Sequence, residues 1–328
     1  MIQISAFKPA WWLSNPHAQT VWPFLFRNRP KLKARSECVE LPDGDFLDIA
    51  WIDNQRGPFI LIMHGLEGSL QSHYAANLIN QLDRAGYSAV FMHFRGCSGK
   101  PNRKDRSYHS GDTKDFDFIL DYIEQQSGRR VSAAIGYSLG GNVLLKWLGE
   151  AGARSRLSIA IAISVPFVLG DTASRLETGL SKLYQGHLLS SLKQSYKTRF
   201  SKRPSPLDVN VETLKSFREY DNEVTAPLNG FRDVDHYYSD SSSRQYLKQI
   251  QTPTLILHAK DDPFMWPTTL PAQEELSESV TLEVSENGGH VGFVSGAIPG
   301  VARYWLERRI IEELQQYMTD NKTAPESQ

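Results

Sequence analysis

Residues 136–140 read Gly-Tyr-Ser-Leu-Gly, and they lie between an apolar run at 131–135 and a helix-like run that begins at Asn142. A Gly-x-Ser-x-Gly pentapeptide between a strand and a helix predicts a sharp turn that strains its central serine and lifts the hydroxyl clear of the sheet. Small residues flank Ser138 because a side chain there would collide with the neighbouring strand or helix. Since the pentapeptide alone is common, it predicts a catalytic serine only if the rest of the chain supplies the partner residues that such a serine needs.

Strand-like segments recur along the chain, with amphipathic helical segments between them. The segments at 59–63, 131–135 and 159–163 are almost continuously apolar, as in strands covered on both faces. Two half-polar segments flank the turn Pro42-Asp43-Gly44-Asp45 and predict an antiparallel hairpin at a sheet edge. The pattern predicts an α/β fold with an open, mostly parallel sheet of eight strands flanked by helices. The strands are expected at 39–41, 46–52, 59–63, 89–92, 131–135, 159–163, 254–257 and 280–284, and the helices at 74–85, 113–126, 142–149 and 303–318.

One region interrupts this alternation. From about residue 166 to residue 251 no strand pattern occurs, and helix-like stretches appear at 173–183 and 211–220. A segment of this length between two core strands is too long for a plain loop, so it predicts an inserted helical cap. We expect a single domain over 1–318 that carries this cap, followed by a disordered tail at 319–328.

Bulk composition excludes several classes of protein. The net charge of −1 and the pI near 6.8 favour no nucleic-acid partner. The two cysteines, Cys38 and Cys97, lie far apart, so neither a disulfide framework nor a metal-ligand pattern is expected. The first residues lack a signal-peptide pattern, and no apolar run reaches the roughly 18 residues of a membrane span. These features predict a cytoplasmic protein without an integral membrane segment.

A serine hydroxyl is a weak nucleophile, so it needs a base, usually histidine, and an acid that orients that base. After a Gly-x-Ser-x-Gly turn, the acid is expected beyond a late strand and the histidine beyond the last one. The strand at 254–257 runs into Asp261 and Asp262. We favour Asp262, because it stands three residues after Ala259, where acids of this fold usually follow the strand. Asp261 is the alternative acid and would otherwise brace the same turn.

The histidine position is filled by His290. The strand at 280–284 runs into Glu286-Asn287-Gly288-Gly289-His290, whose glycines would let the loop return the imidazole toward Ser138. A loop histidine without a catalytic task is the competing interpretation, and the position of His290 after the acid argues against it. The sequence therefore predicts a triad of Ser138, Asp262 and His290.

Two backbone N–H groups are expected to stabilise the negative charge that develops during acyl transfer. One is the amide of Leu139, at the start of the helix after the serine. The other should come from the loop His64-Gly65-Leu66-Glu67-Gly68, whose glycines allow close approach to a substrate. We assign it to Leu66, with Gly65 as the alternative, and expect His64 to brace the loop.

Three further groups of residues have competing interpretations. The stretch Arg95-Gly96-Cys97-Ser98-Gly99 is a glycine-rich turn or a pocket-side loop, and Cys97 has no predicted catalytic role. Basic residues in the cap favour a solvated face, with attraction to anionic lipids or acidic substrates as the alternative: Lys193, Lys197, Arg199, Lys202 and Arg203. Aromatic residues near the N-terminus favour packing against the core or cap, with a membrane-facing patch as the alternative: Trp11, Trp12, Trp22, Phe24 and Phe26.

Taken in order, seven motifs resemble those of the YheT-type esterases of the α/β-hydrolase superfamily, in the branch called AB hydrolase family 4. The resemblance spans about residues 9 to 310 and is more specific than the pentapeptide alone. The motifs are Asn15-Pro16-His17-Ala18-Gln19-Thr20, His64-Gly65-Leu66-Glu67-Gly68, His93-Phe94-Arg95-Gly96-Cys97-Ser98-Gly99, Tyr108-His109-Ser110-Gly111-Asp112-Thr113, Gly136-Tyr137-Ser138-Leu139-Gly140-Gly141-Asn142, Ala259-Lys260-Asp261-Asp262-Pro263-Phe264 and Gly288-Gly289-His290-Val291-Gly292-Phe293.

The resemblance implies a serine hydrolase of carboxylic esters that uses Ser138, Asp262 and His290. We expect short- or medium-chain acyl groups, a small-molecule or lipid ester as substrate, and neither a cofactor nor a metal. Peripheral membrane contact is compatible with this prediction. Two alternatives remain open: acyl transfer to an alcohol in place of water, and a catalytically silent homologue that only binds a ligand.

Overall fold

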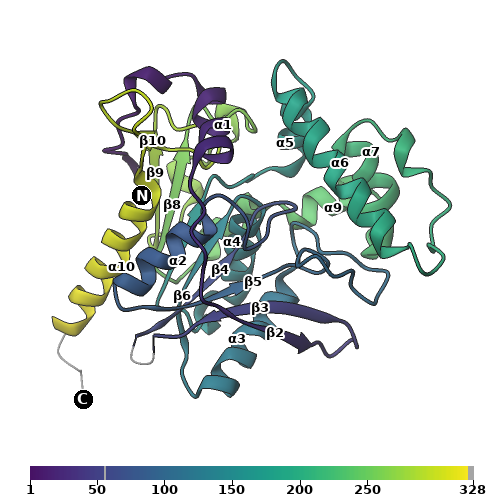
Figure 1. Ribbon diagram of the computed structural model, residues 1–328, viewed down its shortest axis with the longest axis horizontal. Coiled ribbons are helices and arrows are strands. Elements are labelled where there is room, and N and C mark those ends of the chain that lie inside the picture. The colour runs from purple at the N-terminus through teal and green to yellow at the C-terminus, as the bar shows by residue number, and fades with distance from the viewer. Residues whose placement is uncertain (55–56, 324–328) are drawn as a thin grey trace.

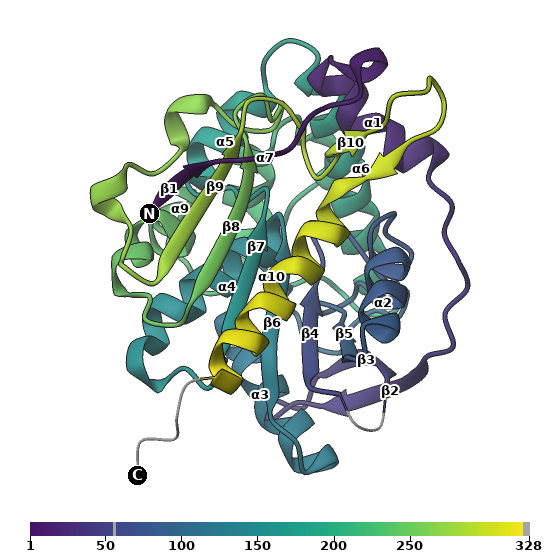
Figure 2. The same cartoon turned by 90° about the vertical axis from the view of Figure 1, so that its left-hand side faces the viewer.

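The computed structural model describes residues 1–54 and 57–323 and contains a nine-stranded sheet with helices on both faces (Figures 1 and 2). The strand order is β1-β9-β8-β7-β6-β4-β5-β3-β2, and all neighbours are parallel except the pairs β3–β5 and β2–β3. The predicted mostly parallel sheet and its edge hairpin are confirmed. The strands are β1 (Ile2–Ile4), β2 (Arg35–Glu40), β3 (Phe46–Ile52), β4 (Phe59–Met63), β5 (Ser88–Met92), β6 (Val131–Tyr137), β7 (Ile159–Ile163), β8 (Thr254–Ala259) and β9 (Val280–Ser285).

The predicted count of eight strands is wrong by one. The additional strand, β1, pairs in parallel with β9 at the sheet edge opposite the hairpin. It has only three residues, and Ile4 is 90% exposed, so its sequence shows neither a buried run nor a clear alternation. It forms a strand because the edge of β9 offers unpaired backbone groups with which it can hydrogen-bond. The local sequence does not show that this edge is available.

Two helical layers cover the sheet. On one face α3 and α4 pack through Phe116, Ile119 and Val143, and on the other α2 and α10 pack through Leu78 and Ile310. These five side chains are fully buried. Figure 2 shows α10 crossing the sheet on the viewer's side. The helices outside the cap are α1 (Pro16–Phe26), α2 (Ala75–Arg84), α3 (Thr113–Ser127), α4 (Leu139–Ala151) and α10 (Trp305–Thr323), and β10 (Val294–Ser295) pairs with β11 (Arg303–Tyr304) in a small second sheet.

Residues 166–251, which we call the cap, connect β7 to β8, and every regular element among them is helical. Figure 1 shows the cap helices standing to one side of the large sheet. The helix expected at 173–183 is two helices, because the chain breaks near Gly179, whose φ is +51°. The stretch at 211–220 forms only a short turn and the four-residue α7. The cap helices are α5 (Leu169–Leu176), α6 (Ser181–Arg199), α7 (Phe217–Tyr220), α8 (Ala226–Leu228) and α9 (Val234–Ser241).

The C-terminal helix runs further than the sequence indicated. Residues 319–323, expected in a disordered tail, continue α10, and residues 324–328 lie outside the described residues. Among the described helices, none combines the length and the apolar character needed to cross a membrane.

The turn between β6 and α4 is the tightest junction of the fold. Ser138 occupies it with φ 50° and ψ −116°, a backbone conformation that residues other than glycine rarely adopt. A Cβ placed on Gly136 would lie 2.4 Å from the Gly140 carbonyl oxygen, and one on Gly140 would lie 2.6 Å from the His64 carbonyl oxygen. The flanking glycines are therefore required by backbone contact, as the sequence predicted.

This junction generates a stability prediction. Gly136→Ala should lower the free energy of unfolding by about 2 kcal/mol or more, because backbone atoms must move to admit the methyl group. Gly186→Ala is the matched control: a Cβ on Gly186, exposed on α6, meets no atom within 4 Å. It should be neutral or stabilise by up to about 1 kcal/mol. Urea denaturation measures both, and equal stability of the two variants would contradict this account.

Candidate active site

The three residues of the predicted triad lie in contact at the carboxyl ends of β6, β8 and β9. His290 Nε2 is 3.0 Å from Ser138 Oγ, and His290 Nδ1 is 2.8 Å from Asp262 Oδ2. The side chains of His290 and Asp262 are 10% and 1% exposed. Because Nδ1 faces a carboxylate, it carries the proton, which leaves Nε2 free to accept from the serine hydroxyl. The arrangement can remove a proton from Ser138 and hold the resulting imidazolium.

The two candidate acids have different partners. Asp262 contacts the imidazole, and its other oxygen accepts a hydrogen bond from the Phe264 amide at 2.8 Å. Asp261 instead accepts from the Gly289 amide at 2.9 Å and from the Asn287 side chain at 3.3 Å. Burial raises the pKa of Asp261. Asp261 therefore braces the loop that carries His290, whereas the sequence suggested that it would brace its own turn.

The loop after β4 leaves one backbone amide available beside Ser138. The Gly65 amide donates to Tyr74 Oη at 2.9 Å, and the Glu67 amide donates to Tyr108 Oη at 2.8 Å. Within the described residues, the Leu66 amide donates no hydrogen bond. The loop is close to the serine, because a Cβ on Gly65 would lie 3.2 Å from Ser138 Cβ. Between the two candidates, the geometry thus favours Leu66 over Gly65 as a donor to an oxyanion.

The second predicted donor, Leu139, is the first residue of α4, where an amide has no partner within the helix. Its N–H donates to no other group in the described part of the chain. His64 braces the neighbouring loop as predicted: its Nδ1 donates to the Gly65 carbonyl at 2.7 Å and its Nε2 accepts from the Phe94 amide at 3.1 Å. Burial lowers the pKa of His64 to about 3, so it remains neutral.

The N-terminal helix α1 supports the loop that carries His290. Thr20 Oγ1 accepts from the His290 amide at 2.9 Å. The fully buried Gln19 side chain accepts from the Val294 amide at 2.7 Å and donates to the Val294 carbonyl at 2.9 Å. Contact is so close that a Cβ on Gly292 would lie 2.3 Å from the Gln19 carbonyl oxygen.

Sequence reasoning did not assign this role to Gln19 or Thr20. The available signal was the helix start at Asn15-Pro16, where the Asn15 side chain accepts from the next two free amides. That signal predicts a helix but does not show that the helix packs against the loop that carries His290. The contact between them joins residues about 270 positions apart.

Two cavities meet at Ser138 and His290. The cap pocket lies between the cap and the loops at 66–67 and 107–110, and its lining is mostly apolar. The outer pocket lies beside α1 and is bordered by Phe24 and Leu25, which are 52% and 60% exposed. Phe264 borders both cavities and stacks on the His290 ring at 4.0 Å.

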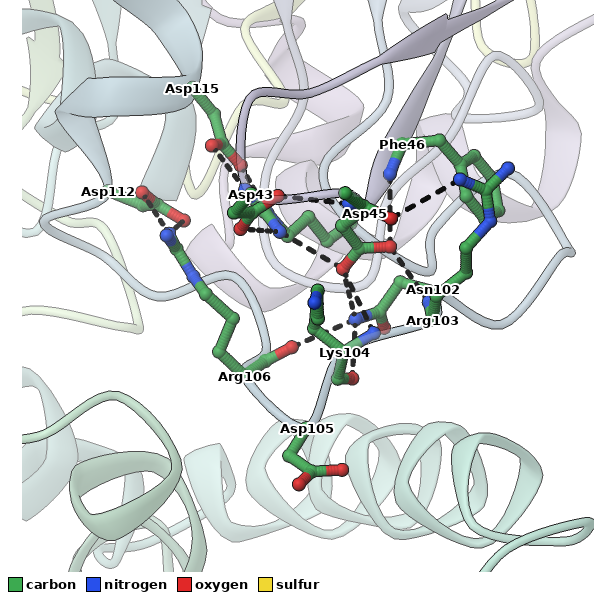
Figure 3. Close-up of polar contacts among 12 residues, drawn as sticks. Asp43, Asp45, Phe46, Asn102, Arg103, Lys104, Asp105, Arg106, Asp112 and Asp115 are labelled. Atoms are coloured by element: carbon green, nitrogen blue, oxygen red, sulfur yellow. Dashed lines mark hydrogen bonds and ion pairs between the residues drawn. The ribbon is translucent and has the colours of Figure 1, made fainter.

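The glycine-rich stretch at 95–99 lines neither pocket. Arg95 turns away from the site and pairs with Asp43 at 2.8 Å, Asp45 at 3.0 Å and Asp115 at 2.6 Å. Figure 3 shows these carboxylates gathered beside the loop that carries Asn102 and Arg106. The pairs join the β2–β3 hairpin to α3, so this stretch is a structural turn.

Other chemistry-bearing groups lie outside the site. Burial raises the pKa of the Cys97 thiol well above its usual value, which disfavours a thiolate. Among the described residues, no three or more His, Cys, Asp or Glu side chains cluster as metal ligands would.

The cap cations do not form one solvated face. Lys197 pairs with Glu212 at 2.6 Å and Arg203 pairs with Asp105 at 2.9 Å, both near the surface. Arg199 contradicts the expectation, because it is 8% exposed and lines the cap pocket. Its sequence neighbours are cationic, but the helical period turns it toward the interior.

The N-terminal aromatic residues divide between packing and exposure. Trp12 packs edge-on against Trp22, with ring centroids 4.9 Å apart, and Trp22 lies 4.5 Å from Phe26. Trp11 and Phe26 are nevertheless 69% and 64% exposed. The expected packing against the core is therefore only part of the arrangement.

Comparison with known proteins places this fold and site in context. Residues 58–297 match the family model described as the alpha/beta hydrolase fold. The Escherichia coli protein named "Putative esterase YheT" is 42% identical over 319 residues, covering 95% of this chain and 94% of that protein. The mouse protein named phospholipase ABHD3 is 28% identical, covering 96% of this chain and 79% of that protein.

Among solved structures, an esterase of Pyrococcus furiosus has a TM-score of 0.58 at 19% identity, over 89% of this chain and 96% of that one. At this identity the likeness shows the fold alone. The family match and the extent of identity to the E. coli protein settle the family: this chain belongs to the α/β hydrolases, in the group of YheT.

Proposed function

We propose that this protein hydrolyses carboxylic esters with short or medium acyl chains through an acyl-enzyme on Ser138. The observation that carries the proposal is the hydrogen-bonded series Ser138–His290–Asp262 at the junction of two pockets. The names of the relatives, an esterase and a phospholipase, agree with ester cleavage.

In the first half of the reaction, Ser138 Oγ attacks the ester carbonyl while His290 Nε2 takes the hydroxyl proton. Asp262, buried against Nδ1, stabilises the imidazolium that forms. The carbonyl oxygen gains negative charge, and the amides of Leu66 and Leu139 donate hydrogen bonds to it. The tetrahedral intermediate then collapses, and His290 passes its proton to the leaving alkoxide.

In the second half, water replaces the alcohol. His290 removes a proton from the water, the hydroxide attacks the acyl-enzyme, and the acid leaves as Ser138 recovers its proton. We assign the acyl chain to the cap pocket, which is lined mainly by buried side chains. The alcohol leaves and water enters through the outer pocket, whose border at Phe24 and Leu25 is exposed.

The two neighbouring acids provide a sharp test of the mechanism. Asp262→Asn should lower kcat on p-nitrophenyl butyrate by about 10³- to 10⁴-fold, because the amide no longer holds the tautomer and charge of His290. Asp261→Asn, the matched control, should keep activity within about tenfold, since in the described part of the chain its carboxylate contacts the loop backbone and Asn287 but not the His290 ring.

Ser138→Ala completes that experiment. It should abolish ester hydrolysis and labelling by a fluorophosphonate probe. Failure of the folded wild-type protein to react with the probe would contradict the proposal and favour a protein that only binds a ligand. Equal effects of the two aspartate substitutions would contradict the assignment of the acid.

A second test concerns the loop that presents Leu66. Tyr74→Phe removes the acceptor of the Gly65 amide and should lower kcat about tenfold with little change in KM, because the loop loses its position. Fluorophosphonate labelling should slow by a similar factor. Tyr87→Phe is the control, since Tyr87 is as little exposed as Tyr74, at 6% each, and in the described residues its hydroxyl makes no hydrogen bond. An unchanged kcat in Tyr74→Phe would show that this contact does not position the oxyanion donor.

A further inference from the structure

The cap pocket contains a buried cation without an ion-pair partner. Arg199, at the end of α6, is 8% exposed and lines the pocket that reaches Ser138. Throughout the described residues, no carboxylate lies within 4.0 Å of its guanidinium, and its Nε makes no hydrogen bond. Arg199 Nη1 donates one long hydrogen bond, of 3.5 Å, to the backbone carbonyl of Asp105.

The acids near Arg199 are already bound to other groups. The Asp105 carboxylate pairs with Arg203 at 2.9 Å. Glu67 accepts hydrogen bonds from the Tyr108 hydroxyl at 2.8 Å and from the Ser195 hydroxyl at 2.5 Å. Among the carboxylates of the described residues, Glu67 compensates Arg199 at a distance, and the guanidinium carbon lies 6.0 Å from the centroid of the Phe200 ring, while burial lowers the pKa of Arg199.

A buried guanidinium is costly unless it is paired, and arginine cannot escape that cost by losing its proton at neutral pH. The buried guanidinium of Arg199 is therefore most stable when a further hydrogen-bond acceptor lies beside it in the pocket. The chain itself supplies none among its described residues, so the acceptor comes from water or from a ligand that enters the pocket and replaces that water.

The position of Arg199 indicates which part of a ligand it meets. Leu188, Leu192, Ser195 and Arg199 all line the cap pocket and follow one another at helical spacing on α6. Leu188 also borders the outer pocket together with Ser138. From Leu188 to Arg199 the helix rises about 16 Å, so along α6 the pocket wall changes from apolar at Leu188 to cationic at Arg199.

We propose that Arg199 binds a carboxylate at the far end of the substrate's acyl chain, so that the preferred substrates are monoesters of dicarboxylic acids. This inference rests on the proposed function, since it takes the acyl chain to lie in the cap pocket. The guanidinium fork matches a carboxylate in two parallel hydrogen bonds. The Glu67 charge nearby disfavours a doubly charged phosphate and leaves a singly charged carboxylate as the better partner.

The test compares two esters that differ only at the chain end: the p-nitrophenyl monoester of suberic acid and p-nitrophenyl octanoate. The wild-type protein should have the higher kcat/KM on the acid-ended ester. Arg199→Met should lower kcat/KM for that ester by about thirtyfold or more and leave the neutral ester within about threefold. Arg199→Lys, which keeps the charge and loses the fork, should retain part of the preference.

Binding supplies a readout that needs no catalysis. Suberate should raise the melting temperature of the wild-type protein and of Ser138→Ala, and it should not raise that of Arg199→Met. The melting temperatures without ligand show whether the Arg199 variants are folded. A stabilised Ser138→Ala protein combined with no esterase activity in the wild type would refute the proposed function and leave the carboxylate site standing.

Three results would overturn the inference. One is an equal loss on both esters in Arg199→Met, which would make Arg199 a structural residue only. Another is a wild-type preference for the neutral ester together with no stabilisation by suberate. The third is stronger stabilisation by octyl phosphate than by suberate that depends on Arg199, which would assign the pocket to a phosphate.

Discussion

The close backbone contact around Ser138 is the constraint on which the site depends. Strand β6 and helix α4 approach so tightly that Gly136 and Gly140 admit no side chain, and Ser138 takes a positive φ between them. The loop after β4 presses against the same turn through Gly65. Because these contacts join backbone to backbone, they hold the Ser138 hydroxyl and the Leu139 amide in one geometry, as the proposed acyl transfer requires.

The histidine side of the site has a different kind of support. The loop after β9 carries residues with positive φ, including Val291 and Phe293, and it has little regular structure of its own. Helix α1, from the other end of the chain, holds this loop through hydrogen bonds of Thr20 and Gln19. Asp261 holds it through the Gly289 amide. The position of His290 therefore depends on contacts between residues that lie near opposite ends of the chain.

The cap covers the side of the site to which we assign the acyl chain. Its helices add a mostly apolar wall above Ser138, and α6 ends that wall with Arg199. Fold and family establish an α/β hydrolase, and a fold of this kind serves many substrates. We therefore place substrate preference in the side chains that the cap turns toward the pocket.

Sequence alone determined the sheet, the edge hairpin and the serine turn, because buried strands and glycine-limited turns leave local patterns in residue order. It also brought Ser138, His290 and two candidate acids to the right strand ends. Only the tertiary structure shows that Asp261 and Asp262, adjacent in sequence, have different partners: Asp261 contacts the Gly289 amide and Asp262 contacts His290. Three other features also arise from pairing and packing between segments that are distant in sequence: strand β1, the support of the His290 loop by α1, and the burial of Arg199. A short stretch of sequence does not contain both partners of such a contact.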